Sequence, residues 1–253
     1  MSNDGERRQV KQVRSGSLRA HAGGGAGERS LLPAAHAPDI VSAARLNPAS
    51  LDALFAIVPY PPSEAALRRL PESARWRELE AHAPPRAGAV RSTALANRRH
   101  TLAVLGYLAS DASAFERLSL AGRMLKEAAA RAPQVIGLAA AGAAGAARAA
   151  LDALLAAALA HAFVLPSWRA ATRDERRIRR IVLLNDVGLD TRYAAAVTRG
   201  TNLARWLTAL PPNILDARGY RRVITTLARS HRLTLRWLDE RALRRAGRAW
   251  DGS

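Results

Sequence analysis

Short apolar runs alternate with stretches of helical periodicity from about residue 52 onward. The apolar runs have the length and the bulky side chains of buried strands. They lie at Leu54–Tyr60, Thr101–Leu108, Gln134–Ala140 and Arg176–Asp186. Helical spacing follows the second run over Ser113–Ala132 and the third over about residues 146–163. This order predicts an α/β domain with a largely parallel sheet covered by helices on its faces.

The helix predicted over Ser113–Ala132 has signals at both of its ends. Ser113 stands at the N-cap position, and Glu116 follows three residues later, as in a capping box. Pro133 cannot continue a helix. The segment is therefore predicted to begin and end at these residues.

The beginning of the chain lacks this pattern. Residues 1–45 combine the run Gly23–Gly25, scattered arginines and few large apolar side chains, which together cannot offset the entropy of ordering. We expect a disordered leader there, followed by an N-terminal α/β domain over residues 46–187. No apolar run of signal-peptide length follows the charged N-terminus, which predicts no secretion signal.

A second unit begins after Val187. It is predicted to contain a helix over about Thr191–Leu210, a break at LPPN, a helix over Ala217–Ser230, a strand at Leu233–Leu238 and a short helix to Ala246. One strand between helices cannot make a sheet of its own with two covered faces. We therefore interpret residues 188–253 as a linker helix and the truncated start of another α/β domain.

The composition is strongly basic, with a formal net charge of +18 and a pI near 11.6. Such a charge suggests a polyanionic partner. The arginines are spread in pairs along the chain, for example Arg98-Arg99 and Arg221-Arg222, which favours ordinary solvated surfaces over a dedicated nucleic-acid site. The absence of cysteine excludes disulfides, cysteine-ligated zinc and thiol catalysis.

Common catalytic patterns are missing from the sequence. Gly137, Gly142 and Gly145 fit neither a dinucleotide-binding nor a Walker spacing, and we interpret them as packing positions. The six histidines lie far apart, and His161, in its apolar helix, is expected to be a satisfied core residue. No serine has nucleophile-elbow glycines around it, and no acidic cluster offers oxygen ligands to divalent cations.

Residues 199–220, RGTNLARWLTALPPNILDARGY, form the most specific motif. Pro211 and Pro212 forbid continuation of the preceding helix, and Asn213 can bond the backbone of the turn. Three leucines are expected to face the core, namely Leu207, Leu210 and Leu215. These roles are structural, and none of the residues is itself a catalyst.

This segment resembles the junction of the leucyl (cytosol) aminopeptidases. There a helix with G-x-N-x-x-R-x-L leads into a P-x-N-x-L turn and then into the helix that opens the catalytic domain. The matching residues here are Gly200, Asn202, Arg205, Leu207, Pro211, Asn213, Leu215 and Tyr220. Upstream, the strand and helix alternation resembles the N-terminal α/β domain of the family, which is related in shape to macro domains.

The resemblance implies a hexameric cytoplasmic metallopeptidase that releases N-terminal amino acids from peptides. Two divalent metal ions, zinc or manganese, would activate the attacking water. The family's ligands, a lysine and several carboxylates including those of N-T-D-A-E-G-R, lie downstream of the P-x-N turn, and this chain contains no such motif. We therefore assign no catalytic or metal-binding residue, expect no metal to bind, and hypothesise a truncated or frameshifted reading frame.

Two other interpretations stay open. The chain could be a basic nucleic-acid-binding module, or a subunit-interaction module that joins hexamers of an intact relative. A membrane partner is not expected, because Arg148, Asp152 and His161 interrupt the most apolar stretch, Val135–Leu165, and much of it is alanine.

Overall fold

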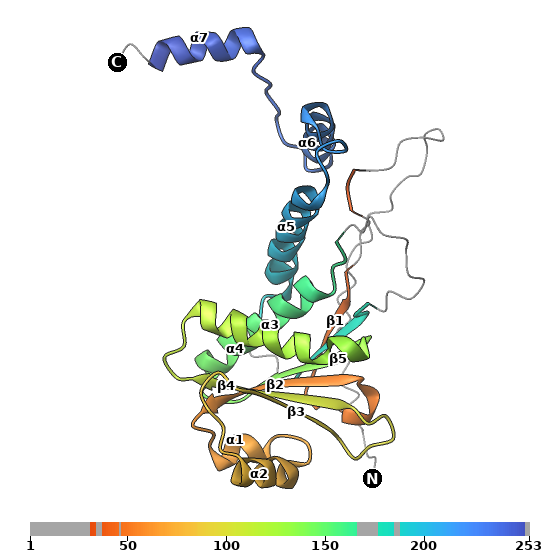
Figure 1. The fold of residues 1–253 in the computed structure, drawn as a ribbon, viewed down its shortest axis with the longest axis vertical. Coiled ribbons are helices and arrows are strands. Elements are labelled where there is room, and N and C mark those ends of the chain that lie inside the picture. The colour runs from red at the N-terminus through yellow and green to blue at the C-terminus, as the bar shows by residue number, and fades with distance from the viewer. Residues whose placement is uncertain (1–30, 34–36, 46, 166–176, 185–187, 251–253) are drawn as a thin grey trace, which may run out of the picture.

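A six-stranded sheet forms the centre of the computed structural model, which describes residues 31–33, 37–45, 47–165, 177–184 and 188–250 (Figure 1). Its strands are β1 (Asp39–Ala43), β2 (Ala53–Tyr60), β3 (Val90–Ala94), β4 (Leu102–Ala109), β5 (Val135–Ala140) and β6 (Arg180–Leu184). Their order is β1-β6-β5-β2-β4-β3, and only the β3–β4 pair is antiparallel. The predicted, largely parallel sheet is confirmed.

Helices cover both faces of this sheet. Strand β2 shows why, since Phe55 and Ile57 point into one buried cluster and Ala56 and Val58 into another. The first cluster is closed by α3 (Ala114–Ala128) and α4 (Ala144–His161), and the second by α1 (Glu64–Arg68) and α2 (Ser73–His82) (Figure 1). Two short 3-10 turns, η1 (Pro48–Ser50) and η2 (Ala129–Arg131), complete the domain. The predicted α/β class is therefore confirmed.

Helix α3 carries the capping box that the sequence predicts. The Ser113 hydroxyl accepts from the Glu116 N–H at 3.2 Å, and the Glu116 carboxylate accepts from the Ser113 N–H at 2.7 Å. The helix lies close on the sheet at Gly106 of β4, where a Cβ atom would come within 2.5 Å of the Met124 sulfur. It ends at Ala128 and continues as η2, so the predicted end at Ala132 is a few residues late.

Helix α4 is long and apolar enough to cross a membrane by length and composition, and no other helix of the described segments is. In this fold it packs against α3, α5 and β5, and eight of its residues are buried. They are Ala147, Ala150, Leu151, Ala153, Leu154, Leu155, Ala158 and Leu159. The interpretation of this stretch as a buried helix is confirmed.

The predicted boundary between the disordered leader and the α/β domain, at residue 46, is wrong. Residues 1–30 lie outside the described residues, but Asp39–Ala43, placed in the leader by the sequence analysis, form β1 and pair in parallel with β6. The strand is short, lies at the sheet edge and has only two large apolar residues, Ile40 and Val41, which is why the pattern of apolar runs missed it. The ordered domain therefore begins before residue 46.

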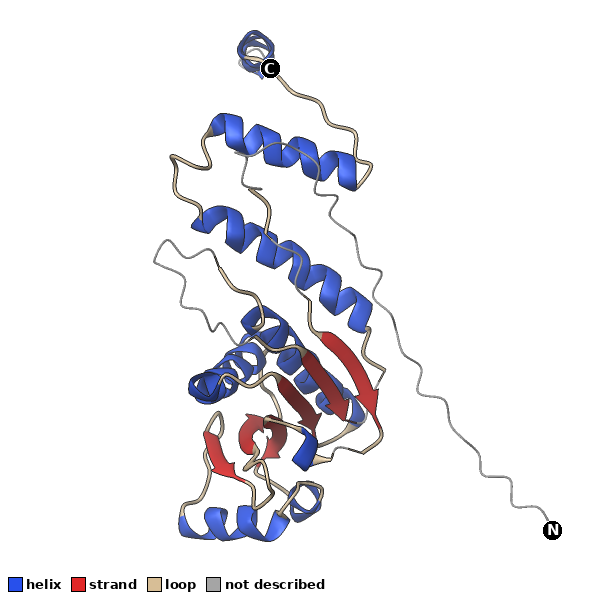
Figure 2. Cartoon of the chain, turned by 90° about the vertical axis from the view of Figure 1, so that its right-hand side faces the viewer, coloured by secondary structure: helices blue, strands red, loops and turns tan. Residues whose placement is uncertain are grey.

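Beyond the sheet, the chain continues as three helices. These are α5 (Thr191–Ala209), α6 (Ala217–Ser230) and α7 (Glu240–Trp250), and the bounds of the first two agree with the prediction. Helix α5 packs on α4, whereas α6 and α7 extend progressively away from the sheet (Figures 1 and 2). The predicted strand at Leu233–Leu238 is wrong, because this segment pairs with no strand of the described chain and has no regular structure.

Candidate functional site

The motif over residues 199–220 lies where α5 leaves the α/β domain and turns into α6. Asp190 caps the start of α5 by accepting from the Tyr193 N–H at 2.9 Å. The helix ends at Ala209 because Pro211 and Pro212 follow, and Leu210 already has an extended backbone. The predicted break at LPPN is confirmed.

Two motif residues fasten α5 to the end of α4. Asn202 is buried in the middle of α5, and its side-chain oxygen accepts from the Arg205 guanidinium at 2.8 Å. The same Arg205 nitrogen donates to the carbonyl of Ala160 at 3.1 Å. An orphan carbonyl in the last turn of α4 thereby gains a cationic donor.

A second anchor lies one position further along α5. The Trp206 ring meets Phe163 edge-on with centroids 6.2 Å apart, and its N–H donates to the carbonyl of Leu31 at 3.0 Å. Sequence reasoning missed Trp206, although an aromatic residue inside the motif was the available signal. Its partners come from distant parts of the chain and could not be found by spacing.

The turn between α5 and α6 is built by backbone and by Asp216. The Pro211 carbonyl accepts from the N–H groups of Ile214 and Leu215 at 2.9 and 3.0 Å. The Asp216 side chain caps α6 by accepting from the Gly219 N–H at 2.6 Å. Gly219 has no room for a side chain, because a Cβ atom would lie 2.9 Å from the Ile214 carbonyl oxygen.

Several motif residues have other surroundings than predicted. Leu207, Leu210 and Leu215 are half-buried and belong to neither buried cluster, so the prediction that they face the core is wrong. Asn213 is exposed, and in the described structure its side chain makes no hydrogen bond to the turn. A side chain at Gly200 would meet open space, and Tyr220 is half exposed. Among the motif side chains that the structure describes, Asn202 and Arg205 are the pair that hydrogen-bond to each other.

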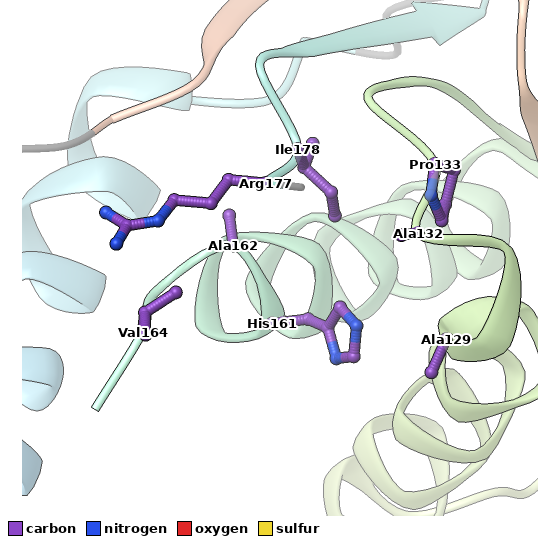
Figure 3. Close-up of a pocket in the computed structure, with 8 residues that line it drawn as sticks. All are labelled: Ala129, Ala132, Pro133, His161, Ala162, Val164, Arg177 and Ile178. Carbon is purple, nitrogen blue, oxygen red and sulfur yellow. The ribbon is translucent and has the colours of Figure 1, made fainter. Parts of the chain in front are cut away.

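A small pocket of about 80 Å³ lies at the C-terminal end of α4, beside η2 (Figure 3). It is lined by Ala129, Ala132, Pro133, His161, Ala162, Val164, Arg177 and Ile178. The His161 ring points toward Ala129, whereas the Arg177 side chain extends past Val164 in the opposite direction. The two polar groups do not converge, and the volume is well below the roughly 300 Å³ of a typical ligand site.

His161 itself is not the core residue that the sequence predicted. It is exposed at the last position of α4, beside the pocket. Partial desolvation there lowers the pKa of the imidazole below its usual value. The ring is exposed because His161 is the last residue of α4 and lies beyond the buried, apolar part of that helix.

Two glycines follow β5, Gly142 in the turn and Gly145 in the first turn of α4. Gly142 has a φ of +123°, which L side chains rarely adopt, so it serves the backbone of the turn into α4. A side chain at Gly145 would meet nothing within 4 Å, so the packing role predicted for it is wrong.

The carboxylates and histidines of the described segments stay dispersed. No three His, Asp or Glu side chains gather there in a group that could hold a metal ion. These residues do not fit the dinuclear centre that the resemblance implies, and no reaction step can be assigned to them.

Comparison with solved structures places the fold. Over 79% of its length the chain superposes on 44% of a mutant tomato leucine aminopeptidase, with a TM-score of 0.59 and 16% sequence identity. The chain shares the fold of this aminopeptidase. It spans less than half of that enzyme's length, and the match agrees with the N-terminal α/β domain that the resemblance implied.

Two further solved structures align with lower TM-scores. The bottromycin maturation enzyme BotP aligns with 72% of this chain and 38% of its own, at 17% identity and a TM-score of 0.49. Leucyl aminopeptidase from Leishmania major aligns with 77% of this chain and 40% of its own, at 13% identity and a TM-score of 0.48. No protein-family model and no curated protein matches the sequence.

Proposed function

We propose that this chain is the N-terminal portion of a leucyl-aminopeptidase-family metallopeptidase. The observation that carries the proposal is the shared fold with tomato leucine aminopeptidase over 79% of the chain. It is supported by the junction motif, in which Asn202 and Arg205 join α5 to α4 immediately before the LPPN turn.

In the intact family member, such a portion would sit beside a catalytic domain that holds two divalent metal ions, manganese or zinc. That enzyme would be a cytoplasmic hexamer that releases N-terminal amino acids from peptides. When bound, the metal pair would lower the pKa of the attacking water and polarise the peptide carbonyl. The residues of this chain contribute the α/β domain and the junction, and we assign to them no step of the reaction.

The 253 residues alone are therefore expected not to hydrolyse aminoacyl amides. The test is release of p-nitroaniline from leucine p-nitroanilide by the purified chain with manganese or zinc, compared with the same protein in chelator. We expect no chelator-sensitive turnover from protein whose circular dichroism shows a folded α/β domain. Metal-dependent turnover that survives further purification contradicts the expectation, because it requires ligands that the described residues do not bring together.

The family assignment has a separate test. A leucyl aminopeptidase of this type presents its junction to a catalytic domain, so the purified chain should bind a catalytic domain of a family member that is supplied in trans. Arg205→Met should weaken this binding by loosening α5, while the exposed Arg199→Met on the same helix should leave it unchanged. Absence of binding by the folded wild-type chain would contradict the assignment.

A further inference from the structure

Arginines gather on one side of α6, although they looked scattered in the sequence. Positions 218, 222 and 229 are four and eleven residues apart, which places them within about 40° of one another around a helix. All three arginines are exposed, whereas Val223 and Leu227, on the opposite side, are buried or half-buried. We call Arg218, Arg222 and Arg229, with Arg232 and Arg236 that follow the helix, the arginine face.

Little negative charge lies near these arginines. Residues 216–239 contain six arginines and only two carboxylates, and both carboxylates cap helices. Asp216 accepts from the Gly219 N–H of α6, and Asp239 accepts from the Ala242 N–H of α7 at 2.7 Å. Within the described structure, Arg218, Arg229, Arg232 and Arg236 form no ion pair with a carboxylate.

An exposed aromatic ring stands beside this charge. Trp237 is 43% exposed, and the Arg221 guanidinium lies 5.1 Å from the centroid of its ring. The N–H groups of Arg232 and Leu233 still donate to the α6 carbonyls of Arg229 and Ala228. Residues 234–238 then have no regular structure and run as an open segment from α6 toward α7 (Figure 1). Arginines along an open path together with an accessible aromatic ring are the features that bind unpaired nucleotides, whose bases have free faces for stacking.

We propose that α6 and residues 231–238 bind single-stranded nucleic acid. The arginine face contacts phosphates, and Trp237, held by Arg221, offers a stacking surface to a base. A duplex keeps its bases stacked inside and cannot use Trp237 in this way, which is why the site favours single strands. This inference does not depend on the peptidase assignment.

The test uses the full 253-residue chain and a fluorescein-labelled DNA strand of about 20 nucleotides, with anisotropy as the readout. We expect the affinity to fall at least about tenfold between roughly 50 and 200 mM salt, because phosphate contacts release counterions. The triple variant Arg218→Gln, Arg229→Gln and Arg232→Gln should reduce the salt slope by about two, since each lost phosphate contact removes about 0.7 for single strands.

A matched control removes the same charge elsewhere. Arg98→Gln, Arg148→Gln and Arg192→Gln are exposed substitutions outside α6, and they should leave the slope nearly unchanged. Trp237→Ala should weaken single-strand binding about tenfold and leave duplex binding unchanged. Circular dichroism of each variant separates loss of binding from loss of fold.

Three results overturn the proposal. Equal losses in the two triple variants would mean that binding follows the overall charge of +18 and not the arginine face. Equal affinity for duplex and single strand, with no effect of Trp237→Ala, would remove the stacking role. Stronger binding to vesicles of anionic lipid than to the oligonucleotide would assign the surface to membranes, through the exposed leucines at 233, 235 and 238.

Discussion

The Thr101 hydroxyl holds the entry to β4 and is fully buried. Its oxygen lies 2.7 Å from the Pro48 carbonyl and 2.8 Å from the Leu51 carbonyl, and it also accepts from the Asn97 amide at 3.1 Å. Thr101→Val removes the hydroxyl at nearly constant volume and leaves buried polar groups without a partner. We expect the free energy of unfolding, measured with urea, to fall by about 1–3 kcal/mol.

Thr101→Ser is the control for that substitution. It keeps the hydroxyl and deletes one methyl group, which costs about 1 kcal/mol in a buried position. If the valine variant is no less stable than the serine variant, the hydroxyl does not stabilise this corner of the sheet.

Because of Tyr107, the free energy of unfolding should depend on pH in the alkaline range. Its buried hydroxyl donates to the Glu80 carboxylate at 2.7 Å, and burial, followed by that carboxylate, raises the pKa of Tyr107 far above its usual value near 10. The folded state holds the Tyr107 proton more tightly than the unfolded state does. The contribution of this hydroxyl to the free energy of unfolding is therefore full below about pH 10 and is lost as the pH rises further.

Tyr107→Phe should therefore be less stable than the wild type at neutral pH by about 1 kcal/mol. The difference between the two proteins should shrink as the pH rises above about 10, because only the wild type loses the proton. Urea midpoints over that pH range measure it, with Tyr193→Phe, at an exposed position, as the reference. A constant difference at all pH values would contradict the account.

Asp52 connects the starts of several elements. One carboxylate oxygen accepts from the N–H groups of Gln134 and Val135, both at 2.9 Å, and the other accepts from Arg99 at 3.1 Å. Asp52→Ala leaves the two N–H groups at the start of β5 without their acceptor, and we expect a loss of about 2 kcal/mol in unfolding free energy. Arg99→Ala breaks only the exposed ion pair and should cost less than about 1 kcal/mol. Similar losses from the two variants would mean that the N–H bonds are replaced by water.

The sequence predicted elements well where local signals were strong. Helix α3 has its capping box, α5 is stopped by two prolines, and the central strands β2 and β4 are apolar on both faces. The short edge strands β1 and β3 bury less and were missed. Leu233–Leu238 has the composition of a strand, but composition cannot supply the neighbouring strand whose hydrogen bonds define one.

The candidate site was predictable as a motif but not as a set of contacts. The resemblance to the aminopeptidase junction identified Asn202 and Arg205, which lie about one turn apart on α5 and hydrogen-bond to each other. Their partner, the Ala160 carbonyl, is 45 residues away from Arg205 and is chosen by the packing of α5 on α4. The arginine face of α6 was likewise hidden, since its arginines become neighbours only once the helix is formed.

Helices α6 and α7 are attached to the α/β domain through α5. In the described structure α5 packs on α4, and α6 and α7 lie further out along the molecule (Figures 1 and 2). Arg205 makes this attachment specific, because its guanidinium bonds both the buried Asn202 and the last turn of α4. A helix held by so few polar contacts should open locally before the sheet unfolds.

Arg205→Met tests this order of opening. Methionine keeps the length and apolar stem of the side chain but cannot donate to the Ala160 carbonyl or to Asn202, so about 1.5–3 kcal/mol of charged hydrogen bonding is lost locally. We expect amide hydrogen exchange in α5 to quicken roughly tenfold or more, while exchange in β2 and β4 stays unchanged. Arg199→Met, exposed on the same helix, should alter neither. If β2 and β4 quicken equally in Arg205→Met, α5 and the sheet unfold as one unit, and the C-terminal helices are part of the domain.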